Sequence, residues 1–107
     1  MNQSRLLEVY QSGQLTVIGF WGHDFLDHVS VHDCQSELAD LVRSADTKTL
    51  ACDLTGIKVL PSGMLGVLAS MRKLGLEVYL FNPTDDVREV LEITQLDQVF
   101  HIETVDV

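Results

Sequence analysis

Short apolar runs alternate with segments of helical periodicity along the chain, a pattern typical of an α/β domain. Runs rich in β-branched and aromatic residues predict strands over residues 6–10, 15–21, 47–54 and 77–81. The first two runs are separated by a short polar turn that contains a glycine, which predicts a hairpin. Residues 57–60 form a further short extended piece.

Apolar residues recur with helical spacing in two segments between these runs. The first segment opens at Ser30 with a pattern that resembles a capping box, and it ends near Ser44. The second has its helical spacing from Met64, with Ser62 placed as the N-cap and Gly75 placed to end the helix. The predicted apolar faces consist of Val31, Cys34, Leu38, Leu41 and Val42 in the first helix, and Met64, Leu65, Val67, Leu68, Met71 and Leu74 in the second.

A third helix is predicted to open at Asn82, with Asn82 as its cap and Pro83 in the first helical position. Asp85 and Asp86 then fall in the first turn, where carboxylates favour the helix dipole. Beyond it the pattern predicts a last turn, a short terminal strand and a loose acidic tail over residues 101–107. The predicted buried stripe of this helix consists of Val87, Val90, Leu91 and Ile93.

The order of these elements is β-β-α-β-α-β-α with a short final strand. Strand–helix–strand repeats favour parallel pairing, with the helices packed on a face of the sheet. The predicted fold class is α/β, with a small mixed and mostly parallel sheet of four to five strands and about three to four helices. At 107 residues, the chain fits one domain over residues 1–107.

The net charge of the chain is −9, from 16 acidic and 7 basic side chains. A surface of this sign repels phosphate backbones and anionic lipid, so we expect no nucleic-acid partner and no membrane partner. Two interpretations of the acidity stay open. It provides solubility, or it raises the association rate with a partner that carries a basic patch.

The two cysteines, Cys34 and Cys52, fall on predicted apolar faces and form no CxxC pair. Free buried thiols are typical of a reducing compartment. The chain also shows no apolar run of the length that a signal peptide or a membrane span needs. We therefore expect a cytoplasmic location.

Candidate chemistry is sparse. The chain lacks a G-x-G-x-x-G loop, a Walker sequence and a G-x-S-x-G nucleophile elbow. His28 and His32 stand four residues apart, as a helical metal pair would, in a segment rich in His and Asp over residues 23–34. However, a cap at Ser30 puts His28 outside the helix, and a solvated helix start explains the cluster as well. We expect no catalytic residue, no metal and no cofactor.

From Leu50 onward the chain resembles the STAS domain family, which includes the anti-sigma factor antagonists, or anti-anti-sigma factors. Asp53 ends a strand as the family's acidic residue does, and Ser62 holds the position of the family's serine. Residues 65–68 (Leu-Gly-Val-Leu) continue the helix in the family's manner, and residues 82–83 (Asn-Pro) match the start of the next one. The resemblance implies a STAS-type fold and a regulatory protein-binding module rather than an enzyme.

In anti-sigma factor antagonists this serine is phosphorylated by the anti-sigma kinase, and the dephosphorylated protein binds that kinase. The resemblance therefore implies a partner-switching role in signal transduction and transcription regulation, with Ser62 as the phosphorylation site. Pro61 stands where the family usually has Asp. This departure supports an alternative, in which the domain is an unphosphorylated scaffold in a signalling assembly or a homodimer. The implied partner-binding surface consists of Lys58, Leu60, Pro61, Ser62, Gly63, Met64 and Gly66.

Three residues of this surface also have a structural interpretation. Ser62 serves as a helix N-cap whether or not it is phosphorylated. Met64 is either an exposed, adaptable contact residue or a member of the core, as most methionines at helical spacing are. Gly66, inside a helix, predicts a close approach between the helix and the sheet.

Overall fold

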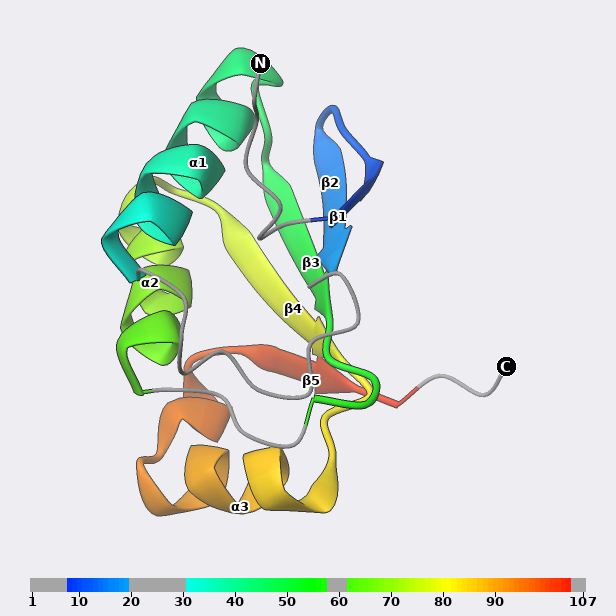
Figure 1. Ribbon diagram of the computed structural model, residues 1–107, viewed down its shortest axis with the longest axis vertical. Helices are drawn as coiled ribbons and strands as arrows, with labels where there is room; N and C mark the ends of the chain where they lie inside the picture. The colour runs from blue at the N-terminus through cyan, green and yellow to red at the C-terminus, as the bar shows by residue number, and fades with distance from the viewer. Residues whose placement is uncertain (1–7, 20–30, 58–61, 105–107) are drawn as a thin grey trace.

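Five strands lie side by side in the order in which they occur along the chain (Figure 1). The computed structural model describes residues 8–19, 31–57 and 62–104. β1 pairs antiparallel with β2, and the pairs β2–β3, β3–β4 and β4–β5 are parallel. The predicted hairpin and the mostly parallel sheet are thereby confirmed. The strands are β1 (Glu8–Gln11), β2 (Leu15–Gly19), β3 (Thr49–Asp53), β4 (Glu77–Phe81) and β5 (His101–Glu103).

Two helices pack along one face of this sheet, and a third lies at its end beyond β5 (Figure 1). α1 (Val31–Ser44) and α2 (Ser62–Lys73) form the helical layer, α3 (Asp85–Ile93) is the third helix, and a 3-10 turn, η1 (Leu96–Gln98), precedes β5. Alternate strand residues point toward α1 and α2, and the burial of the helix residues confirms the predicted apolar faces except at Leu74, and at Val31, whose side chain is not described. The core includes Ile18, Leu50, Cys52, Leu54, Val78 and Leu80 from the sheet side, and Cys34, Leu38, Val42, Met64, Leu65, Leu68 and Met71 from the helices.

The end of α2 confirms the predicted role of Gly75. Gly75 has a positive φ of 92°, which a residue without a Cβ adopts without strain. Its N–H donates to the Arg72 carbonyl at 3.0 Å, and the Leu76 N–H donates to the Met71 carbonyl at 3.4 Å. These two bonds make a Schellman motif, which satisfies the last carbonyls of the helix. The side chains of Leu76 and Met71 are both buried beneath it.

The predicted start of the third helix is wrong by two residues. α3 begins at Asp85, and its N-cap is Thr84, whose Oγ1 accepts the Val87 N–H at 3.4 Å. Asn82 instead has a left-handed φ of 57°, so the chain is still turning there and cannot cap a helix that starts at Pro83. The acidic first turn, with Asp85 and Asp86, is confirmed.

Three other predictions about burial and order are also wrong. Only Val87 and Leu91 of the predicted α3 stripe are buried, whereas Val90 is 40% and Ile93 73% exposed. Leu74, beyond the end of α2, is also exposed. β5 confirms the predicted short terminal strand, but it includes residues 101–103 of the predicted loose tail and pairs with β4 through Tyr79 and His101, Leu80 and Ile102, and Phe81 and Glu103.

Several predictions fall on residues outside the described part of the chain. They are the capping box at Ser30, residues 6–7 of the first predicted strand, residues 20–21 of the second, residues 58–60 of the extended piece and residues 105–107 of the tail. The side chains of residues 31–33 and residues 23–30 of the His- and Asp-rich segment also lie outside it.

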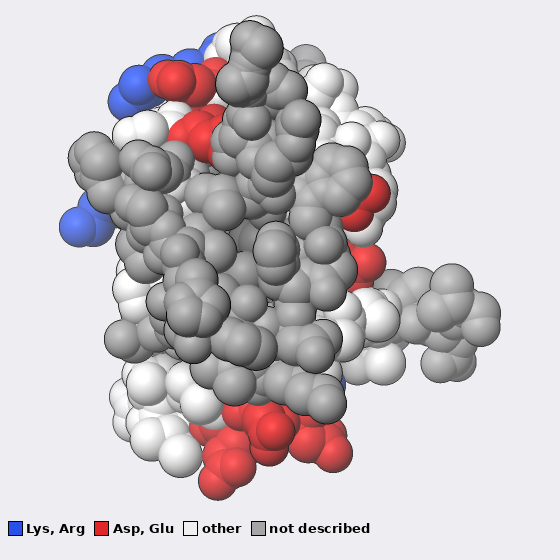
Figure 2. Space-filling view, in the orientation of Figure 1, with Lys and Arg blue, Asp and Glu red and all other residues white. Residues whose placement is uncertain are grey.

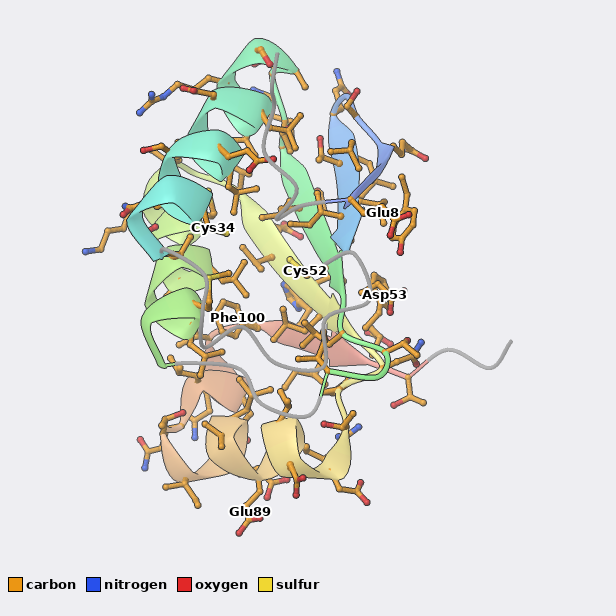
Figure 3. The ribbon with its side chains drawn as sticks, viewed as in Figure 1. Glu8, Cys34, Cys52, Asp53, Glu89 and Phe100 are labelled. Carbon is orange, nitrogen blue, oxygen red and sulfur yellow. The ribbon has the colours of Figure 1, made fainter. Side chains whose placement is uncertain are left out.

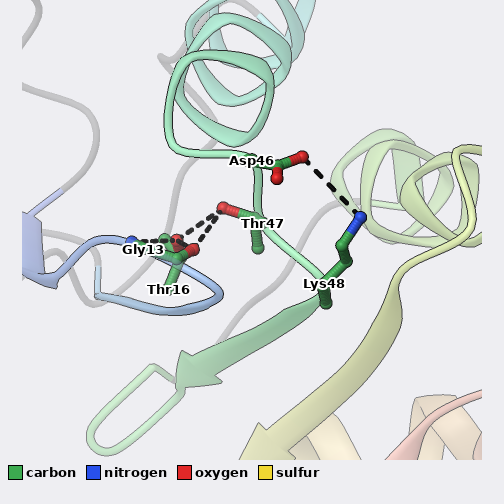
Figure 4. A network of polar contacts seen from close by, with 5 residues as sticks. All are labelled: Gly13, Thr16, Asp46, Thr47 and Lys48. Atoms are coloured by element: carbon green, nitrogen blue, oxygen red, sulfur yellow. Dashed lines mark hydrogen bonds and ion pairs between the residues drawn. The ribbon is translucent and has the colours of Figure 1, made fainter.

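A closed ring of hydrogen bonds joins the β1–β2 turn to the segment between α1 and β3 (Figure 4). The Gly13 N–H donates to Thr16 Oγ1 at 3.3 Å, Thr16 Oγ1 lies 2.7 Å from Thr47 Oγ1, and Thr47 Oγ1 donates to the Gly13 carbonyl at 2.9 Å. Each threonine hydroxyl has one proton to donate. When Thr16 donates to Thr47 and Thr47 donates to the Gly13 carbonyl, both protons form hydrogen bonds. This ring satisfies two threonines that are buried in the fold.

We expect Thr16→Val and Thr47→Val each to lower the free energy of unfolding by about 1–3 kcal/mol. Each change keeps the side-chain shape but leaves buried polar partners of the ring unsatisfied. Urea unfolding of both single variants and the double variant forms a double-mutant cycle. Because the two residues share one ring, the double variant should lose less unfolding free energy than the sum of the losses in the two single variants. Simple additivity would show that the two hydroxyls act independently.

Candidate functional site

The amino end of α2 lies beyond the carboxyl end of β3, and the helix begins at Ser62 itself. Ser62 is thus the first helical residue, one position later in the helix than the predicted N-cap, and its side chain lies outside the described part of the structure. Lys58, Leu60 and Pro61 also lie outside the described residues. The structure therefore places the start of the helix, Gly63, Met64 and Gly66, and leaves the rest of the predicted surface as a prediction.

The first two turns of α2 have a buried side and an exposed side of different character. Met64 is 1% exposed and packs in the core with Leu65, so the core interpretation of Met64 is the correct one. We therefore leave its side chain out of the contact surface. Gly63 and Gly66 lie on the exposed side. At these two described positions the outer surface of the helix is backbone without a side chain.

Gly66 does not mark a close approach of helix and sheet, contrary to the prediction. A Cβ built on Gly66 would meet no atom within 4 Å, leaving aside the backbone of its own helix. Alanine at this position would favour the helix by roughly 1 kcal/mol relative to glycine. Within the described chain, no atom occupies the space that the missing side chain leaves.

The charges along α2 suit an anion at its amino end. Its first turn, residues 62–65, contains no carboxylate, and its last turn carries Arg72 and Lys73. The first N–H groups of a helix lack partners within the helix, and the dipole makes this end positive. A phosphoryl group at Ser62 would therefore meet a favourable field.

A network of polar side chains holds the loops at this edge of the sheet. Asp53 Oδ1 accepts the Thr55 N–H at 3.0 Å and the Thr55 hydroxyl at 2.6 Å. Asn82 Nδ2 donates to Thr55 Oγ1 at 3.3 Å, which links the end of β4 to the turn after β3. The acidic residue that ends β3 thus shapes the turn leading toward Ser62.

Thr84 connects the same loop to α3. Besides capping α3, its Oγ1 donates to the Ile57 carbonyl at 2.8 Å. Ile57 is the last described residue before Ser62 and is itself buried. The sequence pattern did not point to Thr84, because a serine or threonine next to a proline is common in loops. The acidic pair that follows it was the available signal for a cap at this position.

The two cysteines are free and buried, as predicted. Burial raises the pKa of the Cys34 thiol from its ordinary 9.0 to about 11, and the nearby Glu37 carboxylate adds to this effect. Burial also raises the pKa of Cys52, with a smaller contribution from Cys34. Both thiols are thus protonated near neutral pH, a state that disfavours nucleophilic or metal-binding roles.

Two further features of the described residues bear on function. No group of three or more His, Cys, Asp or Glu side chains among them is arranged to hold a metal ion. Within the same residues, no helix has the length and hydrophobicity required to cross a membrane.

Comparison with known proteins agrees with this architecture. None of the curated proteins matches the chain. Among solved structures, the anti-sigma factor antagonist SpoIIAA in its unphosphorylated form shares 16% identity with a TM-score of 0.77, covering 94% of this chain and 88% of SpoIIAA. An anti-sigma factor antagonist (STAS) domain protein from Planctomyces limnophilus shares 22% identity with a TM-score of 0.78, and the match covers 94% of this chain and 90% of that one. These likenesses establish the fold.

The phosphorylated form of SpoIIAA, from Bacillus, is similar as well. It shares 17% identity with a TM-score of 0.68, and the match covers 94% of this chain and 91% of that one. The family profile described as the STAS domain matches residues 7–105, which is nearly the whole chain. The chain therefore belongs to the STAS domain family.

Proposed function

We propose that this protein is a regulatory module of a partner-switching pathway and binds an anti-sigma factor or a related serine kinase. The binding surface centres on the amino end of α2, and phosphorylation of Ser62 is the switch. The observation that carries the proposal is that α2 starts at Ser62 with Gly63 and Gly66 exposed beside it. A partner can approach the helix backbone closely there, in the space that Gly66 leaves open.

Phosphorylation at this position would change binding without unfolding the domain. The N–H groups and the dipole of α2 stabilise a phosphate at the first helical residue. Toward a partner, however, the phosphate adds about −1.5 to −2 charges in the middle of the contact surface. Burying that charge requires its desolvation, which the partner does not compensate unless it presents cations.

The proposed role is non-enzymatic and requires no cofactor. Met64 and Leu65, in the first turn of α2, are buried in the core and fix the position of the helix, as a docking surface requires. The two free buried thiols support action in the cytoplasm, where thiols stay reduced.

The test of this function is the intact mass of the protein isolated from its native cells, before and after phosphatase treatment, with the modified residue mapped. The expected result is one phosphate on Ser62 under some growth conditions. Stoichiometric absence under all conditions would support the alternative that Pro61 favours, a constitutive scaffold or homodimer in which Ser62 only begins the helix.

We expect Ser62→Asp to weaken binding of the partner kinase domain by about 100-fold or more, a loss of roughly 3 kcal/mol. The carboxylate puts a charge at the centre of the contact, while its negative sign suits the positive amino end of the helix. Ser62→Ala should bind nearly as well as the natural protein. Calorimetric titration of the purified partner against each variant measures the difference, and thermal unfolding shows whether each variant is folded.

A matched control is Ser44→Asp, which adds the same charge at an exposed serine in the last residue of α1. It should leave the affinity within about twofold. Gly66→Gln provides a second probe, because it fills the open space on α2 while favouring the helix. Equal affinities for Ser62→Asp, Gly66→Gln and the natural protein would place the partner's contact elsewhere on the domain.

A further inference from the structure

The face of the sheet opposite α1 and α2 carries an open apolar depression. Its volume is about 440 Å³. The depression extends over the three central strands β2, β3 and β4, and an exposed leucine, Leu15, lies at its edge with 43% of its surface accessible. The lining residues are Leu15, Val17, Thr49, Ala51, Tyr79 and Phe81.

An uncovered face is unusual for strands that pair in parallel. Parallel sheets are normally covered on both faces, because the crossover helices that connect their strands pack on both sides of the sheet. Here β2, β3, β4 and β5 pair in parallel, while α1 and α2 both lie on one side of them (Figure 1). Among the described residues, no helix packs over Val17, Ala51 and Tyr79.

Aromatic rings extend this apolar surface across the sheet. Tyr79 stacks on His101 with ring centroids 4.5 Å apart, and the rings of Tyr79 and Phe81 lie 6.2 Å apart. On the other side the ring of Tyr10 lies against Gly19, where a Cβ would come within 2.8 Å of the Tyr10 hydroxyl oxygen. Exposed or half-exposed rings thus lie on both sides of the depression, Tyr10 from β1 on one side and Tyr79, Phe81 and His101 from β4 and β5 on the other.

Carboxylates surround these rings on the same face. In the strand register, Glu77 alternates with Tyr79 and Phe81, and Phe81 pairs with both Asp53 and Glu103. Glu8 pairs with Gly19, which shares the face of Val17. Figure 3 shows Glu8 and Asp53 on the side of the sheet away from the helices, and Figure 2 shows acidic atoms along that edge of the molecule.

The charge of this face is uncompensated within the sheet. The five strands contain no lysine and no arginine. The pKa of Tyr10 is raised, first by partial burial, then by its hydrogen bond to Glu8, and also by the carboxylates of Glu8 and Asp53. Tyr10 donates to Glu8 Oε1 at 3.2 Å. His101, whose Nε2 lies 3.9 Å from Glu77 Oε1, is the basic side chain that the strands contribute.

We propose that this open face binds an extended cationic segment of a partner protein, in which basic residues alternate with apolar ones. Apolar side chains of the segment fill the depression between Leu15 and Phe81, and its cations meet Glu8, Asp53, Glu77 and Glu103. The site lies on the opposite side of the sheet from α2, so it is independent of the proposed switch at Ser62 and leaves that surface free.

Charge selects this occupant over the others. A second copy of the chain would bring two faces of the same negative sign together, and like charges at close range disfavour such contacts. Anionic lipid and nucleic acid are repelled for the same reason. A cationic amphipathic segment satisfies both the apolar lining and the surrounding carboxylates.

The experiment titrates the isotope-labelled protein with a synthetic ten-residue peptide in which lysine alternates with valine and tyrosine, followed by two-dimensional amide NMR. The expected result is a set of shifts in residues of β2, β3 and β4, with an affinity that falls as salt is raised. A peptide with glutamate in place of lysine should give no shifts.

Variants identify the contact surface. Glu77→Gln and Glu103→Gln should each lower the affinity for the peptide about threefold, which is within the range for exposed ion pairs. Leu15→Thr should weaken it while leaving the strand intact, because threonine suits an exposed strand position. The matched control is Glu89→Gln with Glu92→Gln on α3, where Glu89 points away from the sheet (Figure 3). That control should not change the affinity.

Four results of the peptide titrations would overturn the proposal. They are equal weakening by the α3 control, shifts that map to the start of α2, binding of the glutamate peptide, and the absence of any shift. Shifts of the same strands with protein concentration alone, together with dimerisation in sedimentation, would identify a second copy as the occupant and would also overturn it.

Discussion

The free energy of unfolding should fall steeply as the pH is raised from about 9 to about 11, by roughly 1.4 kcal/mol per pH unit for each buried thiol. In the unfolded chain the thiols ionise above their ordinary pKa of 9.0. In the folded protein burial raises the pKa of Cys34 to about 11 and that of Cys52 further upward. The folded state therefore retains protons that the unfolded state releases in this window, and rising pH favours unfolding.

Urea unfolding in the presence of reductant, at intervals from about pH 8 to about pH 10.5, measures this slope. The control is the double variant Cys34→Ala with Cys52→Ala, in which tyrosines and lysines titrate as before. The slope of its unfolding free energy against pH should be shallower than that of the natural protein by roughly 3 kcal/mol per pH unit, since two thiols are removed. Parallel slopes for the two proteins would contradict the assigned burial of the thiols.

Leu91→Ala should lower the free energy of unfolding by about 2–5 kcal/mol, whereas Ile93→Ala should change it by less than about 0.5 kcal/mol. Both residues lie on α3 and were predicted in one buried stripe. Leu91 is fully buried in the core, and its truncation leaves a cavity. Ile93 is 73% exposed, so its truncation removes little packing.

Equilibrium unfolding of the two variants in parallel gives the comparison. Because the pair sits on one nine-residue helix, changes in helix propensity affect both similarly. A similar loss for both variants would mean that the outer side of α3 is also covered in solution. A negligible loss for Leu91→Ala would mean that α3 is not docked on the core.

The strands and the faces of α1 and α2 were predictable because apolar residues recur along them with a regular period. In β3, Leu50 and Cys52 alternate with Thr49 and Asp53, and the structure buries the first pair against the helices. β4 has the predicted bounds, Glu77–Phe81, since polar residues and a glycine precede it and a turn follows. Local periodicity determines such elements with little help from tertiary contacts.

The wrong predictions concern elements whose burial and pairing depend on tertiary contacts. α3 is short and packs at the end of the sheet, so only positions one turn apart, Val87 and Leu91, reach the core. A helical stripe in the sequence does not reveal how narrow that contact is. A short final strand was predicted, but not that it lies within residues 101–103 and pairs with β4, because a strand of three residues has too few positions for periodicity to set its bounds.

The candidate sites show the same division. The resemblance located Ser62, and the structure begins α2 there, but periodicity alone left Met64 open between core and surface. The open sheet face was not predicted at all. Val17 and Tyr79 are residue types that also occur in cores, and they stay half-exposed because α1 and α2 both lie on the other side of the sheet, with no described helix over this face.

The order of the strands bears on how the chain folds during synthesis. Each strand pairs with the one made just before it, from β1 through β5. The sheet can therefore grow from the amino end as the polypeptide leaves the ribosome, and no strand has to insert between two that are already paired. The growing edge of the sheet is unpaired until the next strand covers it, so the interval between successive strands sets how long that edge is open to aggregation.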